Sequence, residues 1–341
     1  MAQIVDGRVR QAQFRSTSPT ITSAGRSPDD PQGRRNGHLL AIGCEEQNLF
    51  LTLRGVTGAT AFFRDREIKW WGSGENGAPA GDAGPTRNMA SSQILCVNFL
   101  MPLAPHPNVL LALLRSLDHD VTNIVELRYG PPIARRDVAS LVEFEWVGLR
   151  TSLEGRPITR GANVTSADAL IVANTNRGRR RAYIFEWKYV EEYPEDEYKG
   201  AGKAGETRRT RYAERCQSSP LLSGVVPIDE LLYEPFYQIV RLGLLADKMI
   251  REGEFGVAEA RVAVVCPSEN VQYRERITSP PLRTRFPESR SVEEVAKRLW
   301  RDPATFRMTT PEALSRAVRN VAKGGSLQGW MTYMSERYGW A

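Results

Sequence analysis

The chain of 341 residues is poor in the residues that build the commonest metal and redox centres. Its four cysteines are far apart: Cys44, Cys96, Cys216 and Cys266. No CxxC pair exists, which disfavours a zinc ribbon or a redox motif and predicts free thiols in a reducing compartment. Only three histidines occur, none in a catalytic context. The sequence therefore disfavours histidine-ligated metal enzymes and Ser-His triads.

Long apolar runs are also missing. No run approaches the length of a membrane span, and the N-terminal stretch MAQIVDGRVRQAQFR lacks the apolar core of a signal peptide. We therefore expect a soluble, cytoplasmic protein with no membrane partner. The glycine-rich stretch GSGENGAPAGDAGPTRN lacks the Lys-Ser/Thr ending of a Walker phosphate loop. The net charge of +6 is a modest basic excess, compatible with a polyanionic partner such as nucleic acid.

The length suits one large domain with appendages. Residues 1–37, rich in Arg, Ser, Gly and Pro, predict a flexible basic arm, either a plain tail or an arm that contacts nucleic acid. Residues 38–290 are expected to form the main folded domain, and residues 291–341 a C-terminal helical extension. The charged stretch 191–219 predicts a long loop.

Apolar patterns predict the elements of the folded part. Runs that alternate or are rich in branched residues predict strands over 61–71, 141–149, 165–174, 181–189 and 259–267. Amphipathic or buried patterns predict helices over 91–104, 107–119, 228–250, 291–300 and 310–324. This order of elements indicates an α/β or α+β fold, with helices covering a central sheet.

One predicted strand, RAYIFEWKY over residues 181–189, carries an unusual charge pattern. Alternation places its aromatic residues on one face, and Glu186 with Lys188 on the other. The preceding strand begins at Asp168, and a glycine turn joins the two as a hairpin. Both carboxylates can then face one site. Upstream, Glu143 and Glu145 are expected on one face of LVEFEWVGL, opposite Val142, Phe144 and Trp146.

Two or three carboxylates beside a lysine suit a site for Mg²⁺, which takes oxygen ligands and retains water. Such a metal activates water, and a lysine can orient that water or stabilise developing negative charge. An ExK triplet alone is weak, because the chain also has Glu67-Ile68-Lys69 and Glu197-Tyr198-Lys199. Only the triplet at Glu186 follows an acidic strand start by a hairpin-sized interval. A solvated Glu–Lys pair is the alternative interpretation.

Cationic residues occur on both sides of this strand. The turn NRGRRR and the stretch KGAGKAGETRRTRYAER provide candidate phosphate contacts at Arg177, Arg179, Arg180, Arg181, Arg208 and Arg209. The turn is expected to lie beside the carboxylates. Solubilising surface charge is the alternative interpretation.

With these residues the sequence resembles the PD-(D/E)xK nuclease superfamily, whose fold is restriction-endonuclease-like. The matching pattern is Asp168 followed by Glu186-Trp187-Lys188. The blocks GANVTSADALI, YIFEWKYVEEY and YEPFYQIVRLGLLA resemble bacterial proteins described as putative endonucleases of this kind, and weaker similarity runs through SSQILCVNFLMPL. The resemblance covers roughly residues 90–250. Ala167 stands where the superfamily has its proline.

The resemblance implies a central mixed sheet flanked by helices. It implies Asp168 and Glu186 as metal ligands, Lys188 as the catalytic lysine, and an earlier acidic residue, Glu145 or failing that Glu143. Gln238 and Tyr237 fit the residue that many members carry on a following helix, with helix packing as the alternative.

We therefore expect a Mg²⁺-dependent DNA endonuclease, in which Mn²⁺ can substitute, acting on double-stranded DNA in restriction or defence. A homodimer would suit the cutting of two strands. A nucleic-acid-binding module without cleavage is the first alternative. A metal-independent two-carboxylate enzyme such as a glycosidase is the second, but it leaves the lysine and the arginines unexplained.

Overall fold

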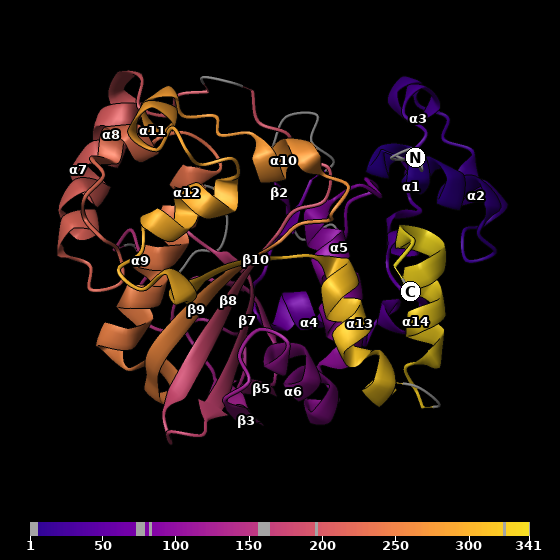
Figure 1. The fold of residues 1–341 in the computed structure, drawn as a ribbon. Helices are drawn as coiled ribbons and strands as arrows, with labels where there is room; N and C mark the ends of the chain where they lie inside the picture. The colour runs from indigo at the N-terminus through magenta and orange to yellow at the C-terminus, as the bar shows by residue number, and fades with distance from the viewer. Residues whose placement is uncertain are drawn as a thin grey trace.

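A computed structural model describes residues 6–72, 79–81, 84–155, 164–194, 197–322 and 325–340 of the chain. Its centre is a six-stranded sheet between two groups of helices (Figure 1). The strands are β3 (Val121–Val125), β6 (Glu143–Trp146), β7 (Ala167–Thr175), β8 (Arg180–Trp187), β9 (Val257–Val265) and β10 (Phe306–Thr309).

The strand order is β10-β9-β8-β7-β3, and β6 also pairs with β7. The pairs β8–β9 and β9–β10 are parallel, whereas β7 pairs with β8, β3 and β6 in antiparallel orientation. The sheet is therefore mixed, which confirms the predicted fold class. β6 pairs with the first residues of β7, and β3 pairs with its last residues.

The first face of the sheet is strongly aromatic. Tyr183, Phe185 and Trp187 of β8 all pack into the same core, as the alternation predicted. Four of the helices that contribute to this core are α5 (Ser92–Leu100), α6 (Pro107–Arg115), α13 (Pro311–Ala322) and α14 (Gln328–Tyr338). α5 is buried along nearly its whole length because its sequence, SQILCVNFL, has no charged residue.

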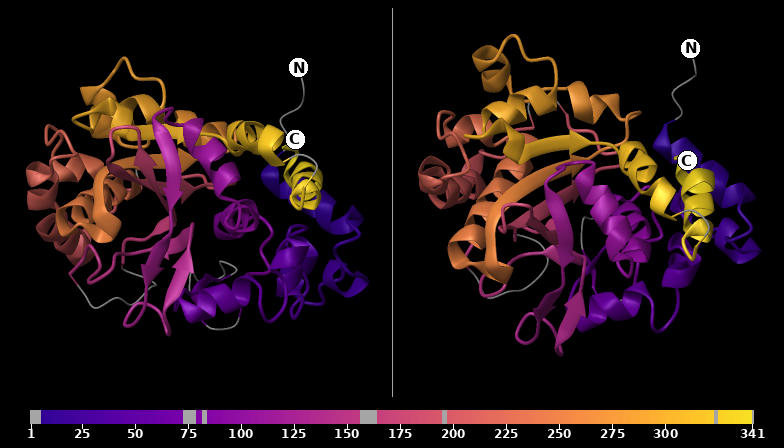
Figure 2. Two further views of the ribbon diagram at one scale, coloured as in Figure 1. Left: turned by 90° about the horizontal axis from the view of Figure 1, so that it is seen from below. Right: turned by 60° about the horizontal axis from the view of Figure 1, so that its bottom comes forward.

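The second face packs against a separate core. Ala182 and Ile184 of β8 join it, together with Leu170 and Val172 of β7. Its helices are α7 (Gly202–Ser218), α8 (Ile228–Leu231), α9 (Phe236–Glu252), α10 (Val271–Glu275), α11 (Pro280–Arg285) and α12 (Val292–Arg298). The two views of Figure 2 show the sheet between these helices and the first group.

Shorter elements complete the fold. The remaining helices are α1 (Gly7–Thr17), α2 (Ser23–Arg26), α3 (Pro31–Arg35) and α4 (Ala59–Asp65). Two small antiparallel pairs are β1 (Trp70–Trp71) with β2 (Pro79–Gly81), and β4 (Leu127–Tyr129) with β5 (Val138–Ser140). Single 3₁₀ turns occur at Glu45–Asn48, Leu51–Leu53, Met101–Leu103, Glu254–Gly256 and Pro303–Thr305.

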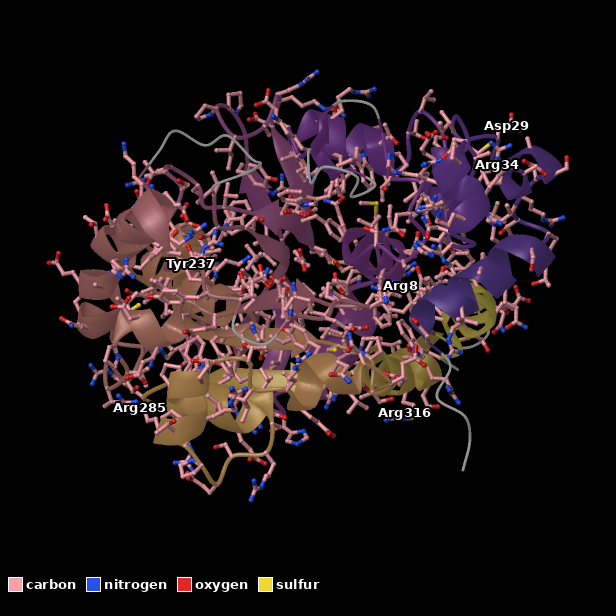
Figure 3. The ribbon with its side chains drawn as sticks, turned by 90° about the horizontal axis from the view of Figure 1, so that it is seen from above. Arg8, Asp29, Arg34, Tyr237, Arg285 and Arg316 are labelled. Carbon is pink, nitrogen blue, oxygen red and sulfur yellow. The ribbon has the colours of Figure 1, made fainter. Side chains whose placement is uncertain are left out.

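The N-terminal segment is not the flexible arm that its composition predicted. From Gly7 onward it forms α1 to α3, and α1 packs beside α14. Phe14 is only 4 % exposed, and the Gln11 amide lies between the Tyr189 hydroxyl and the Arg337 guanidinium, at 2.8 Å from each. A few buried contacts therefore fix a segment that is polar on average. Figure 3 shows Arg8 of α1 and Tyr237 of α9 on opposite sides of the molecule.

Three other sequence expectations are corrected. Residues 61–71, expected as a strand, contain the end of α4 and then β1, and the expected loop 191–219 contains the 17-residue helix α7. The expected helix 228–250 is divided into α8 and α9 at Pro235. The expected helical extension 291–341 also supplies β10, which completes one edge of the central sheet.

Within the described residues, no helix is long and apolar enough to cross a membrane.

Candidate active site

The β7–β8 hairpin brings Asp168 and Glu186 together. Ala169 pairs with Phe185, so the same antiparallel register places Asp168 opposite Glu186 at the open end of the hairpin. The Asp168 carboxylate accepts a hydrogen bond from the backbone N–H of Trp187, at 2.6 Å. Trp187 itself packs behind the strand against Phe99, with ring centroids 5.0 Å apart. The predicted proximity of the two acidic residues is therefore present in the structure.

Glu186 and Lys188 form a buried ion pair. The Lys188 ammonium lies 2.7 Å from Glu186 Oε1, and the two residues are 5 % and 2 % exposed, respectively. The backbone N–H of Lys188 donates to the Val265 carbonyl of β9, which fixes the chain at this point. The second oxygen, Glu186 Oε2, is buried and has no hydrogen-bond partner among the described residues. An unpartnered buried carboxylate oxygen is costly, and a cation or a hydrogen-bond donor beside it would relieve that cost.

The third carboxylate belongs to Glu145 rather than Glu143. Glu145 Oε1 accepts hydrogen bonds from Gln93 and from the Trp71 indole, at 2.8 and 3.0 Å, and Oε2 accepts one from the Ser166 hydroxyl at 2.8 Å. Its charge is close enough to raise the pKa of Asp168. Its backbone has φ of +47°, an uncommon conformation for a residue with a side chain.

Glu143 serves a different purpose. Its fully buried carboxylate pairs with the Arg66 guanidinium at 3.0 Å and accepts hydrogen bonds from Tyr129 and Ser140. The prediction that Glu143 and Glu145 lie on one face of the strand is therefore wrong. The positive φ at Glu145 also breaks the alternation of β6, since Phe144 packs into the first core and Trp146 into the second.

Burial and mutual repulsion shape the electrostatics of the cluster. Burial, and after it the charges of Glu186 and Glu145, raise the pKa of Asp168 well above its usual range. Burial also raises the pKa of Glu186, although the Lys188 ammonium opposes this shift. For Lys188 burial lowers the pKa, but the Glu186 carboxylate together with Tyr193, Tyr273 and Glu191 outweighs burial, and the pKa is raised. Negative charge is thus in excess here, and a bound cation would relieve it.

The donor set fits a hard divalent cation. Asp168 and Glu186 offer carboxylate oxygens, and the unpartnered Glu186 Oε2 provides a ready ligand. In the part of the chain that the structure describes, no group of three or more His, Cys, Asp or Glu side chains is arranged to hold a metal by itself. Two carboxylates with water and substrate oxygens are the usual Mg²⁺ environment, whereas a zinc site would need more protein ligands.

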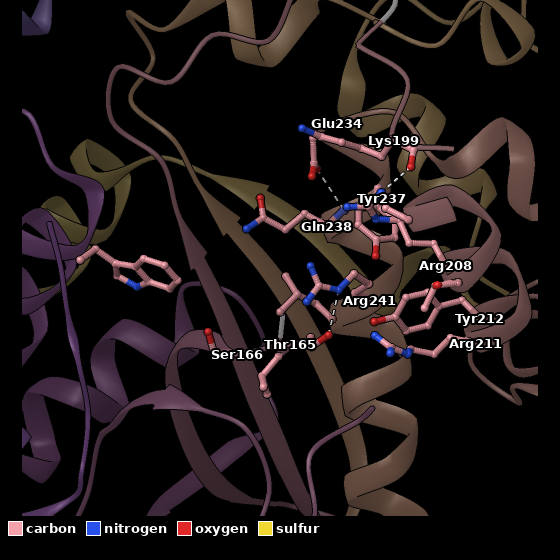
Figure 4. A pocket seen from close by; sticks show the side chains of 15 residues that line it. Thr165, Ser166, Lys199, Arg208, Arg211, Tyr212, Glu234, Tyr237, Gln238 and Arg241 are labelled. Carbon is pink, nitrogen blue, oxygen red and sulfur yellow. Dashed lines mark hydrogen bonds between the residues drawn. The ribbon is translucent and has the colours of Figure 1, made fainter. Parts of the chain in front are cut away.

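A pocket of about 610 Å³ opens beside the cluster (Figure 4). Ser166 and Trp71, which donate to Glu145, form part of its wall, and residues of α7 and α9 form most of the rest. Four cationic side chains line it: Lys199, Arg208, Arg211 and Arg241. The only acidic residue in its described lining is Glu234, whose pKa is raised by burial and lowered to a lesser extent by Lys188.

Helix α9 presents Tyr237 and Gln238 to this pocket, as the resemblance implied for a residue on a following helix. Gln238 Oε1 is buried and has no hydrogen-bond partner among the described residues. Sequence reasoning missed Arg241 and Glu234. A signal was available for Arg241, because it follows Tyr237 and Gln238 by one helical turn and shares their side of α9.

The arginines of the β7–β8 turn do not lie at the site. The turn closes the hairpin at the end opposite Asp168 and Glu186, and seven residues of β7 separate them by more than roughly 20 Å. Arg179 pairs with Glu259, and Arg180 donates to the Phe255 carbonyl. The expected position of Arg177 to Arg181 beside the carboxylates is therefore wrong, because a hairpin turn lies at the far end from its open ends.

Arg181 in particular is a structural residue. It is 4 % exposed, and its guanidinium lies 2.7 Å from both Asp120 and Glu259. On α7, Arg208 lines the pocket, but Arg209 does not, because it pairs with Asp229 and donates to the Tyr198 hydroxyl. Of the six predicted phosphate contacts, the structure places only Arg208 next to the site, and it adds Arg211 and Arg241.

Comparison with known proteins gives one match. The model of the family described as Restriction Endonuclease associating with ARP matches residues 62–339, which include every residue of the carboxylate cluster and of the pocket. No curated protein and no solved structure matches the chain. The match agrees with the resemblance to PD-(D/E)xK nucleases and with the mixed sheet flanked by helices. The chain therefore belongs to this family of restriction endonucleases.

Proposed function

We propose that the protein is a Mg²⁺-dependent DNA endonuclease that hydrolyses phosphodiester bonds. The observation that carries the proposal is the open end of the β7–β8 hairpin, where Asp168, Glu186 and Lys188 meet and one buried carboxylate oxygen lacks a partner. Family membership supports nuclease activity in general. The metal, the substrate and the roles of the residues are the specific part of the proposal.

Each residue has a role that follows from its contacts. Asp168 and Glu186 would hold the metal, and Glu145, oriented by Trp71, Gln93 and Ser166, would complete its surroundings through water. When bound, Mg²⁺ lowers the pKa of a water ligand and offsets the charge that develops on the phosphate.

Lys188 and Gln238 act on the substrate side. The Lys188 ammonium, anchored through its backbone to β9, can donate hydrogen bonds to the attacking water and to a phosphate oxygen. Gln238, at the pocket wall, can orient water or substrate through its amide. The pocket cations attract the DNA backbone.

Plasmid cleavage tests this proposal. Supercoiled plasmid is incubated with the wild-type protein in Mg²⁺, in Mn²⁺ and in EDTA, and nicked and linear products are separated on a gel. We expect cleavage with either metal and none in EDTA. Lys188→Ala and Glu186→Gln should each lower the rate by at least about a hundredfold, because each removes a group that acts in the transition state.

Lys69→Ala is a matched control. Lys69 belongs to another ExK triplet but its side chain is exposed, so this variant should cleave like the wild type. Intact plasmid under all metal conditions, or equal cleavage by wild type and Lys188→Ala, would contradict the proposal. Binding of DNA without any cleavage would instead favour a nucleic-acid-binding module of the same fold.

A further inference from the structure

The pocket borders the proposed catalytic site through Ser166 and Trp71, which line it and donate to Glu145. Ser166 lies in the pocket wall, and its hydroxyl donates to Glu145 Oε2 at 2.8 Å. Glu234 lies in the same wall, where burial raises its pKa and the charge of Lys188 opposes this shift. A ligand in the pocket would therefore lie next to the scissile phosphate. The kind of ligand that the pocket binds best would then determine which substrates the enzyme selects.

Two of the four cations that line the pocket are not balanced by an acidic side chain among the described residues. Neither Arg208 nor Arg211 forms an ion pair with any residue that the structure describes. The guanidinium carbon of Arg211 lies 5.9 Å from the centroid of the Tyr212 ring, and Arg208 donates to the Lys199 carbonyl at 2.6 Å. Guanidinium groups without carboxylate partners, side by side in a concave wall, are suited to a phosphate group.

A third guanidinium is held in place before any ligand arrives. Arg241 Nε donates to the Thr165 hydroxyl at 2.8 Å, and its guanidinium lies 5.1 Å from the centroid of the Tyr237 ring. Behind it, the buried carboxylate of Glu154 lies 3.7 Å from Arg241 and accepts hydrogen bonds from Thr165 and Tyr212. This fixed arrangement reduces the entropy that would be lost when a phosphate binds.

The size of the pocket and its uncharged side chains indicate which chemical group is attached to the bound phosphate. A volume of about 610 Å³ is typical of sites for small molecules and is too small for a double helix. Tyr237 provides an aromatic wall, and the unpartnered Gln238 Oε1 can accept a hydrogen bond from an N–H of a nucleobase. In a continuous duplex the bases are stacked and paired, so only an unpaired nucleotide can place its base here.

We propose that this pocket binds one unpaired nucleotide of the substrate strand, with its phosphate against Arg208, Arg211 and Arg241 and its base against Tyr237 and Gln238. The inference rests on the proposed nuclease function and adds a substrate class to it. The enzyme then selects DNA that is single-stranded, or duplex DNA that is opened at the cleavage position, over continuous duplex.

Binding measurements test the pocket separately from cleavage. Fluorescence anisotropy gives the Kd for a labelled 20-nucleotide DNA strand, for the same strand in a perfect duplex, and for a duplex with one unpaired central nucleotide, all with Ca²⁺ in place of Mg²⁺. We expect the single strand and the bulged duplex to bind at least about tenfold more tightly than the perfect duplex. Tight binding of the single strand alone would identify single-stranded DNA as the source of the nucleotide.

A pair of variants on the same helix isolates the role of the pocket. Arg211→Ala should weaken binding of the single strand about tenfold, because it removes one charge-assisted phosphate contact. Arg209→Ala removes the same charge two residues away, outside the pocket, and should weaken binding about twofold at most. Equal affinity for single strand and perfect duplex, or equal effects of the two variants, would overturn the inference.

The outcomes also separate this inference from the proposed function. Selective binding of unpaired DNA without cleavage in Mg²⁺ would reject the nuclease proposal and support the pocket. Cleavage of single strand and perfect duplex at equal rates, with Arg211→Ala as active as the wild type on both, would support the nuclease and reject the pocket.

Discussion

At the scale of single residues, the buried carboxylates of the proposed site lower the stability of the folded protein. The pKa values of Asp168 and Glu186 are both raised, which means that the folded protein disfavours their charged forms. The Glu143 carboxylate is also buried, but its charge is balanced by the Arg66 guanidinium, which lies 3.0 Å away. Two buried acidic residues of the same sheet, Glu143 and Asp168, therefore have opposite relations to stability.

This contrast gives a prediction for neutral variants. Asp168→Asn should raise the stability of the metal-free protein by about 1–2 kcal/mol at pH 7, because it removes a disfavoured charge and its oxygen can still accept from Trp187. Thermal unfolding with and without Mg²⁺ measures this. The ion should stabilise the wild type but not the variant.

Glu143→Gln is the matched control, and it should destabilise the protein because it leaves Arg66 buried without a charge partner. A loss of stability in Asp168→Asn, or an equal Mg²⁺ effect in wild type and Asp168→Asn, would contradict this account of the carboxylate cluster.

The ion pairs of Arg181 lead to a second prediction at this scale, about how the stability of the protein depends on pH. The hydrogen bonds of Arg181 lower the pKa of Asp120 in the folded protein, so the Asp120 carboxylate binds a proton more readily in the unfolded chain. The ion pair of Asp120 with Arg181 therefore contributes fully to stability at a pH above about 4, the pKa of Asp in an unfolded chain. This contribution is lost as the pH falls through the lower pKa that Asp120 has in the folded protein. Asp120→Asn should cost about 1–2 kcal/mol at pH 7 in urea unfolding, and less at pH 4.

The exposed Asp29 serves as the control, since Asp29→Asn should change stability little at either pH. A cost for Asp120→Asn that is the same at both pH values would show that the ion pair with Arg181 is not its source.

At the scale of elements, helix α7 determines where the pocket cations lie. The helix begins at Gly202, and a Cβ added at Gly205 would lie 1.9 Å from the backbone carbonyl oxygen of Gly200. Only glycine permits this close approach of the helix to the preceding turn. Arg208 and Arg211 are one and two turns further along the same helix, so their positions depend on this contact.

Gly205→Ala should therefore displace α7 without removing any cation. We expect a loss of about 1–3 kcal/mol in stability, together with weaker binding of single-stranded DNA. Thermal unfolding and fluorescence anisotropy measure the two effects. Lys203→Ala, an exposed change in the same helix, should alter stability by less than about 0.5 kcal/mol. Normal stability and affinity in Gly205→Ala would show that the helix is not anchored at this point.

The elements also show what the sequence could and could not predict. The β7–β8 pair was predictable because alternation and a glycine turn define both strands, and Asp168 and Glu186 followed from it. α7 was not, because only Gly205, Tyr212 and Cys216 of its 17 residues are buried, which leaves no clear apolar period. The choice between Glu143 and Glu145 depended on one positive φ angle that no pattern indicates.

At the scale of the whole molecule, the N-terminal helices close the first core. Arg337 of α14 is fully buried and donates hydrogen bonds to Gln11, to Asn48 and to the Met89 carbonyl. Gly7 of α1 lies against Tyr189, directly after Lys188. Residues 7–61 lie outside the range matched by the family, yet they are packed against the strand that carries the proposed catalytic lysine.

This packing predicts resistance to proteolysis. A flexible arm with six arginines between Arg8 and Arg35 would be removed by trypsin within minutes, whereas packed helices are cleaved only after local unfolding. Limited trypsin digestion followed by mass spectrometry should therefore show native protein that retains this segment. Rapid loss of the first 35 residues, with the remainder intact, would contradict the packing of α1.

The contact between Gln11 and Arg337 joins residues that are 326 positions apart in the chain. During synthesis on the ribosome, the β7–β8 hairpin can form long before α14 exists, so Asp168 and Glu186 meet early. The surroundings of Tyr189, which combine α1 with Tyr338 and Trp340, are assembled only when translation is nearly complete. A nascent chain thus carries its acidic residues for most of its synthesis without the final packing next to Lys188, and the proposed catalytic site is one of the last parts of the fold to be completed.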